Sequence, residues 1–137
     1  MKGLRLYKSE KLCSRTAVLS LFGEGSGVMA YPLRAMIRQR PYDPERPAQM
    51  LITIPKKRVR HAVNRVLLRR RVREAYRLNR RTLLLPALET ANTAIDLAFI
   101  YVANEVLDFH IIDRKMKTLL KRISDNLITD NGTSLPT

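Results

Sequence analysis

The residues best suited to chemistry are the cations that crowd the stretch 56–82. This stretch holds twelve of the chain's 26 basic residues and one acidic residue, Glu74, and the whole chain carries a formal net charge of +14. Arginine binds phosphate oxygens through two parallel hydrogen bonds, and so much positive charge on a compact protein indicates a polyanionic partner. The pattern predicts nucleic-acid binding, with phosphate contacts from Lys57, Arg58, Arg65, Arg69, Arg70 and Arg73.

Catalysis by the protein's own side chains is not indicated. The sequence has no paired carboxylates, no nucleophile beside a base and no glycine-rich phosphate loop in a supporting context. Cys13 is the only cysteine, and it forms no cluster at metal-ligand spacing with His61 and His110. We therefore expect no catalytic and no metal-binding residue, with Cys13 as a small structural residue and His61 at the surface.

Targeting and membrane signals are not indicated either. The N-terminus does not resemble a secretory signal, because the charged residues Lys8, Glu10 and Lys11 follow a short stretch of mixed polarity. The longest apolar runs, such as 98–103, fall far short of the roughly 20 residues that span a bilayer. The basic stretch also lacks the broad apolar face of a membrane-surface helix. A cytoplasmic protein is expected.

The basic stretch is predicted to be one long helix. Neither glycine nor proline interrupts residues 56–85, and arginine, leucine and alanine favour a helix that ends near Pro86. Its apolar residues recur at helical spacing in two stripes, Val59, Ala62, Val63 and Val66, then Leu68, Val72 and Ala75. Both stripes are expected to face a core, with a row of arginines beside them.

The remaining elements follow from periodicity and from chain breakers. A helix is expected over 14–22, capped by Ser14, then strands over 28–40 and 50–54 separated by a proline-rich turn or mobile loop at 41–47. The stretch 94–102 is apolar on both faces, which is typical of a central buried strand in which Asp96 is structural. An amphipathic helix is expected from about 108 to 127.

This order of elements predicts an α+β fold. We expect a small sandwich of a mixed sheet of about four strands with three helices, in the order α-β-β-(β)-α-β-α. Residues 1–128 should form one domain, monomeric on its own. The polar stretch 129–137 has too little apolar surface to order itself and is expected to be a mobile tail.

The stretch 57–74 resembles the signature of the bacterial ribonuclease P protein family. The usual signature has two cations, an apolar residue, Ala-Val, Arg-Asn-Arg, a basic pair and Arg-Glu. The matching residues are Lys57, Arg58, Val59, Ala62, Val63, Arg65, Arg69, Arg70, Arg73 and Glu74. Val66 and Leu67 replace the usual Asn and Arg, Arg60 replaces Gly, and His61 stands where Asn is common. The order of elements fits the family over nearly the whole chain.

The resemblance implies a subunit of ribonuclease P, the ribonucleoprotein endoribonuclease that removes the 5′ leader from precursor tRNA. The basic helix would contact the catalytic RNA, and a cleft between the first helix and the sheet would hold the single-stranded leader. Cleavage would depend on Mg²⁺ held chiefly by the RNA subunit. The family also implies a left-handed crossover through the basic helix, against the usual handedness.

Five residues are candidates for leader binding. Phe22, Val18 and Met36 would form an apolar floor for unstacked bases, and Arg34 and Arg38 would bind leader phosphates. Each also has a structural explanation, because apolar residues on an amphipathic helix commonly face the core and exposed strand arginines are often inert. The alternative function is a ribosomal or RNA-assembly protein, which composition does not exclude and against which the spaced signature argues.

Overall fold

The computed structural model describes residues 10–12 and 15–134, so Cys13 and the predicted cap Ser14 lie outside the described residues. The elements in chain order are α1 (Arg15–Glu24), β1 (Ser26–Ala30), β2 (Leu33–Pro41), β3 (Ala48–Thr53), α2 (Ala62–Leu83), α3 (Leu85–Ala91), β4 (Thr93–Tyr101) and α4 (Phe109–Ser134). The predicted α+β class is confirmed. The described residues contain a fourth helix, α3, where three helices were expected.

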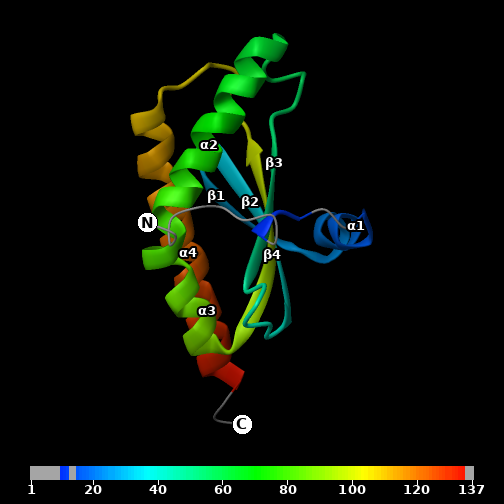
Figure 1. Ribbon diagram of the computed structural model, residues 1–137, viewed down its shortest axis with the longest axis vertical. Coiled ribbons are helices and arrows are strands. Elements are labelled where there is room, and N and C mark those ends of the chain that lie inside the picture. The colour runs from blue at the N-terminus through cyan, green and yellow to red at the C-terminus, as the bar shows by residue number, and fades with distance from the viewer. Residues whose placement is uncertain (1–9, 13–14, 135–137) are drawn as a thin grey trace.

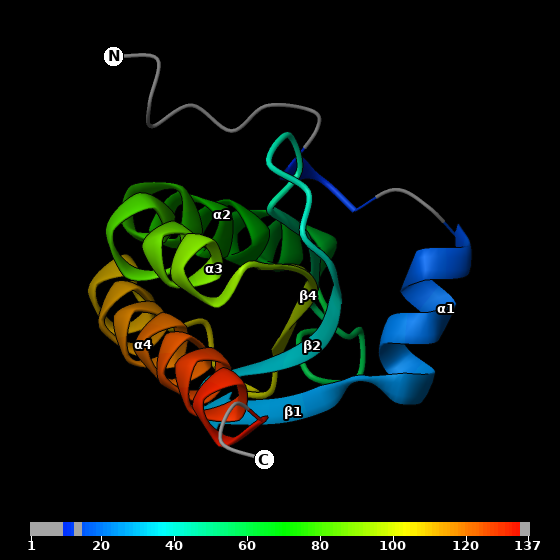
Figure 2. The same ribbon diagram turned by 90° about the horizontal axis from the view of Figure 1, so that it is seen from below.

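The strands form one mixed sheet in the order β1-β2-β4-β3. β2 pairs antiparallel with β1 and β4, and β3 pairs parallel with β4. The helices α2, α3 and α4 cover one face of this sheet, and α1 lies against the other (Figures 1 and 2). The connection from β3 to β4 passes through α2 and α3; its left-handed sense stays a prediction.

The core lies between the sheet and the layer of α2, α3 and α4. β4 lies between β2 and β3 and is buried along almost its whole length, which confirms it as the predicted central strand. Tyr76 of α2 packs against Phe99 of β4 with ring centroids 5.4 Å apart. Burial raises the pKa of the Tyr76 phenol well above its ordinary value, so this side chain stays neutral in the core.

The stretch 28–40, predicted as one strand, contains two strands. Tyr31 and Pro32 form a turn between β1 and β2, and Ala30 pairs with Leu33 across it. Proline has no N–H to donate to a sheet and favours a turn, so Pro32 interrupts the alternation that otherwise continues through β2. Within β2 the expected alternation is confirmed, because Leu33, Ala35 and Ile37 are buried against the helices.

The basic helix is shorter than predicted at both ends. Residues 56–61 form turns and loop, and α2 begins at Ala62 and ends at Leu83. Pro86 does not end regular structure but stands in the first turn of α3. Proline is well tolerated there, because the first N–H groups of a helix have no partner within it.

The last helix is longer than predicted. α4 extends to Ser134, whereas the sequence predicted an end near residue 127. Six positions of the expected polar tail, 129–134, therefore continue the helix, and residues 135–137 lie outside the described part of the chain. The mobility of this tail stays a prediction.

The loop between β2 and β3 is attached to the sheet through Arg40. The Arg40 Nε donates to the buried Asp96 carboxylate at 2.9 Å, and a terminal nitrogen of Arg40 donates to the carbonyl of Arg46 at 2.6 Å. Asp43 accepts from the backbone N–H groups of Glu45 and Arg46 within the loop. The structural role that the sequence assigned to Asp96 is thereby explained, because its charge is compensated by Arg40.

Candidate nucleic-acid interface

The start of α2 is held by one of the predicted RNA-contact residues. A terminal nitrogen of Arg65 donates to the carbonyls of Val59 and Arg60, at 3.0 and 2.7 Å. His61 occupies the N-cap position with an exposed side chain that makes no capping hydrogen bond. Arg65 therefore fixes the loop that leads into α2, and only its remaining N–H donors are available to a partner outside the protein.

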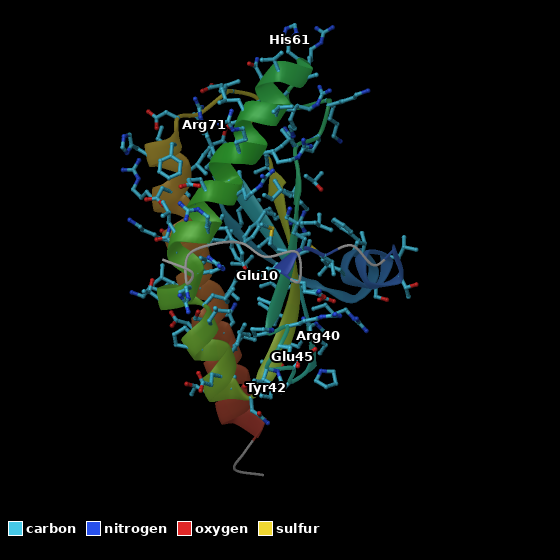
Figure 3. The ribbon with its side chains drawn as sticks, viewed as in Figure 1. Glu10, Arg40, Tyr42, Glu45, His61 and Arg71 are labelled. Atoms are coloured by element: carbon cyan, nitrogen blue, oxygen red, sulfur yellow. The ribbon has the colours of Figure 1, made fainter. Side chains whose placement is uncertain are left out.

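A second arginine, Arg71, holds the fold on the α4 side of α2. Arg71 is labelled in Figure 3. Its terminal nitrogen donates to the carbonyl of Leu107 at 2.6 Å, in the connection from β4 to α4. The N–H of Leu107 in turn donates to the Tyr101 hydroxyl at 3.2 Å. Burial raises the pKa of Tyr101, so the hydroxyl remains protonated and available to this network.

Arg80 anchors the N-terminal segment to α2. Its Nε and a terminal nitrogen donate to the two carboxylate oxygens of Glu10, at 2.6 and 3.2 Å. The Arg80 side chain is only 3% exposed. Adjacent to Glu10, Leu12 donates its N–H to the Met50 carbonyl, so residues 10–12 lie along the edge of β3.

The single acidic residue of the basic stretch is neutralised within α2. Glu74 accepts two hydrogen bonds from Arg77, at 2.5 and 3.1 Å. The hydrogen bond from Arg77 holds the pKa of Glu74 below its usual value, and the same bond raises the pKa of Arg77. Glu74 therefore remains ionised and paired at neutral pH, and subtracts little from the potential around its neighbours.

Three of the predicted contact residues in α2 are left for an outside partner. Arg69 is half-buried, and Arg70 and Arg73 are exposed. Within the described part of the chain, none of these three forms a hydrogen bond or an ion pair. Lys57 and Arg58, which precede the helix, are also exposed. The cations that the sequence selected thus lie in α2 and in the loop before it, and Arg65 is partly committed to the fold.

The first apolar stripe predicted for the basic helix is wrong. Val59 is buried, but it precedes the helix, and Val63 and Val66 are 79% and 52% exposed. The second stripe, which contains Leu68 and Val72, is buried as predicted. The reason is geometric: the second stripe sets which side of α2 faces the sheet, and Val63 and Val66 fall outside that side.

The leader-binding candidates share the face of the sheet that α1 covers. Arg34, Met36 and Arg38 alternate with the buried residues of β2 and so lie on the opposite face from α2. Val18 of α1 and Met36 are half-buried and pack against a small cluster formed by Leu12, Leu21 and Ala98. Phe22 is 45% exposed at the end of α1. Their binding to a leader stays a prediction.

Two glycines lie near this face. A Cβ on Gly27 of β1 would lie 3.2 Å from a terminal nitrogen of the flexible Arg34 side chain and 3.6 Å, an ordinary contact distance, from the Met36 sulfur, so a small side chain there would shift Arg34 only slightly. A Cβ on Gly25 would lie 2.4 Å from the Leu21 carbonyl oxygen, closer than any side chain permits. The chain can pass from α1 into β1 only because this position is glycine.

The sequence did not predict that Lys11 lies near the arginines of α2. It lies on the segment beside β3 and, with Arg69 and Arg73, borders a cleft at the sheet edge. No local pattern marks residues 10–12 as an addition to the sheet, because the pairing partner is about forty residues away in the chain.

The described residues hold no group of three or more His, Cys, Asp or Glu side chains that could bind a metal ion. None of the helices in the described ranges is long and apolar enough to cross a membrane.

A comparison with protein families identifies the chain. The model of the family described as Ribonuclease P matches residues 6–124. The chain belongs to the ribonuclease P protein family. Two relatives named "Ribonuclease P protein component", from two strains of Porphyromonas gingivalis, are each 39% identical over 122 residues, covering 89% of this chain and 88% of the relative.

Solved ribonuclease P proteins have the same fold. The protein of Thermotoga maritima, solved with 1-(4-fluorophenyl)-2-thiourea, superposes with a TM-score of 0.65 at 24% identity and covers 82% of this chain and 98% of its own. The protein of Staphylococcus aureus gives a TM-score of 0.64 at 17% identity, covering 85% and 96%. At these identities the superpositions establish the fold.

Family membership decides between the two functions that composition left open. As a ribonuclease P protein component, the chain is a subunit of that ribonucleoprotein enzyme, has a role in tRNA processing and has RNA as its partner. The residues that carry the family signature lie in the loop before α2 and in α2 itself. The alternative of a ribosomal or assembly protein finds no support in these comparisons.

Proposed function

We propose that this ribonuclease P subunit binds the catalytic RNA through α2 and holds the 5′ leader of precursor tRNA against the face of the sheet that α1 covers. The observation that supports the proposal is that some α2 arginines bind groups within the protein and others do not. Arg69, Arg70 and Arg73 have no partner in the described part of the chain, whereas the neighbouring Glu74 is already paired. A row of arginines without internal partners is suited to phosphate oxygens.

The contribution of α2 is affinity and position. Arg69 and Arg73 lie one turn apart on α2, and Arg70 follows Arg69 about 100° around the helix axis, so together they can bind neighbouring phosphates of one backbone. Because α2 is packed on the sheet through its other side, bound RNA would be fixed relative to the α1 face. A rigid support of this kind orients the substrate without chemistry by the protein.

The α1 face has the composition expected for single-stranded RNA. Phe22 and the half-buried Val18 and Met36 present apolar surface, and Arg34 and Arg38 stand on the same side of β2. Bases that are not paired can rest on such surface while arginines bind the phosphates between them. These contacts would hold the leader and so promote its removal.

The proposal assigns cleavage to the RNA subunit. Mg²⁺ held by RNA would activate water and stabilise the leaving oxygen. The carboxylates and histidines of the described residues are not grouped to hold such an ion. Because the protein's cations reduce repulsion between two RNAs, its contribution should be largest at low Mg²⁺ and in low to moderate salt.

The test is cleavage of precursor tRNA by the cognate ribonuclease P RNA at low Mg²⁺. Wild-type protein should stimulate cleavage, and a variant with Arg69, Arg70 and Arg73 all changed to Ala should fail to do so. The matched control changes Arg114, Lys117 and Lys121 of α4 to Ala, which removes the same charge from another helix. The control should stimulate cleavage nearly as well as wild type.

The outcomes separate the parts of the proposal. Equal loss of stimulation in both variants would show that net charge matters and α2 does not. If folded wild-type protein left cleavage at low Mg²⁺ unchanged, the proposed role in the reaction would be refuted. Leader binding is tested separately with Phe22→Ala, which should weaken binding of precursor tRNA and leave binding of mature tRNA unchanged.

A further inference from the structure

A cleft of about 270 Å³ opens at the β3 edge of the sheet, beside α2. Its floor is apolar and consists of Leu12, Met50, Leu51 and Ile52. Met50 packs into the core that α2 covers, whereas Leu51 packs against the cluster under α1, so side chains from both faces of β3 meet here. The cleft therefore lies over the sheet edge, between the two surfaces already described. We call it the edge cleft.

Cations stand on both sides of the edge cleft. Arg69 and Arg73 border it from α2, and Lys11 borders it from the N-terminal segment. None of the described residues that line it is acidic. An apolar floor between cations matches a nucleotide, which combines a flat base with an anionic phosphate. It does not match an apolar peptide, which has no negative charge to pair with the three cations.

The strand edge adds polar groups to this floor. The carbonyl of Met50 accepts from the Leu12 N–H at 2.9 Å on the edge of β3 away from β4. Backbone groups of a strand alternate between its two sides, so Ile52 directs its N–H and carbonyl toward the same edge. A backbone donor and acceptor beside an apolar floor can meet the hydrogen-bonding edge of a base.

We propose that the edge cleft binds one unpaired RNA nucleotide, with its base across the β3 edge between Leu51 and Ile52 and its phosphates held by Arg69 and Arg73. The inference rests on the proposed function, because it assigns a single nucleotide to a place beside α2. It goes further by predicting that α2 does more than bind a phosphate backbone. Two of its arginines would also act as the clamp of a base-binding site between α2 and the α1 face.

The first experiment measures methyl NMR spectra of the full chain during titration with adenosine monophosphate, ribose 5-phosphate and inorganic phosphate. Adenosine monophosphate should produce ring-current shifts at the Leu51 and Ile52 methyl groups, and the two ligands without a base should not. The Arg69→Ala, Arg73→Ala double variant should weaken all three ligands. Equal shifts from ribose 5-phosphate would reduce the site to a phosphate site, and absent shifts would remove it altogether; either result overturns the proposal.

The second experiment uses oligoadenylate and an abasic strand of equal length, which carry the same phosphates. Wild-type protein should prefer oligoadenylate, and Ile52→Ala should reduce this preference about tenfold, the scale of one base contact. Ile111→Ala on α4 is the matched control and should keep the preference. An unchanged preference in folded Ile52→Ala protein would contradict the proposal. Failure of precursor-tRNA cleavage, by contrast, would concern the proposed function alone.

Discussion

The outward and the inward-turned arginines of α2 come from one uninterrupted basic run, yet they perform different tasks. Arg70 is exposed and forms no hydrogen bond or ion pair within the described residues, whereas its neighbour Arg71 donates to the Leu107 carbonyl. Arg81 is exposed, whereas Arg80 is buried and paired with Glu10. One step along a helix is a rotation of about 100°, which is enough to move a side chain from solvent into the fold.

This contrast shows that the charge of a segment overstates its binding surface. Arg65, Arg71, Arg77 and Arg80 direct donors to groups within the protein. Their charge still contributes to the potential around α2, but their geometry is already committed. The interface proposed here therefore depends on fewer cations than the composition indicates, and single substitutions should separate the two groups.

The largest effect is expected for Arg80→Ala. Removing Arg80 leaves the partly buried Glu10 carboxylate without this partner, which should lower the free energy of unfolding by about 3 kcal/mol. Urea denaturation would measure it. Arg81→Ala is the control and should change stability by less than about 0.5 kcal/mol. Similar losses in the two variants would contradict the division between anchored and exposed arginines.

The adjacent pair Arg70 and Arg71 should respond in opposite ways. Arg71→Ala should cost about 2 kcal/mol of stability, because it removes a charged donor to Leu107. Arg70→Ala should keep stability but lower the slope of log RNA affinity against log salt by about one, as expected for one lost phosphate contact. Urea denaturation of both variants measures stability, and RNA binding at several salt concentrations measures the slope. Together they test these opposite responses. A shared response would remove the distinction.

Val66→Arg tests the exposed side of α2. Since Val66 is 52% exposed, the substitution should change stability by less than about 0.5 kcal/mol and should strengthen RNA binding by adding a cation near Arg70. Thermal denaturation and binding to the catalytic RNA measure the two effects. A stability loss of about 2 kcal/mol or more would place Val66 in a core, as the sequence alone had predicted.

The smallest effect is expected for Glu74→Gln. The pKa of Glu74 is lowered by Arg77 in the folded protein, so the pair stabilises the fold above the ordinary value of 4.5 and this stability is lost as pH falls through the folded value. Wild type should therefore be slightly more stable than Glu74→Gln at pH 7, and the difference should vanish in acid. A difference that grew on acidification would contradict the assigned pair.

Much of the fold was accessible from sequence because it depends on local pattern. The alternation of β2, the apolar run of β4 and the spacing of Leu68, Val72 and Ala75 each identify an element and its buried side. The predictions failed where local pattern was ambiguous. Proline at position 32 makes a turn and proline at position 86 begins a helix, and only the surrounding packing distinguishes these uses.

The candidate site was accessible to a similar extent. Arginine spacing identified Arg69, Arg70 and Arg73, and alternation placed Arg34 and Met36 on one face of β2. The exposure of Val63 and Val66 could not be predicted from the helical period, because the sequence contains two apolar stripes and the period does not show which of them faces the core. The edge cleft could not be anticipated either, since it joins residues 11–12, 50–52 and two turns of α2.

The sequence by itself determined the basic character of the protein, its α+β class, its central strand and the family to which its signature belongs. The tertiary structure decided which arginines are available to RNA and which stabilise the chain. The physical reason is that charge and periodicity are properties of a segment, whereas the partner of a guanidinium group is a neighbour in space. For Arg80 that neighbour is Glu10, seventy residues earlier in the chain.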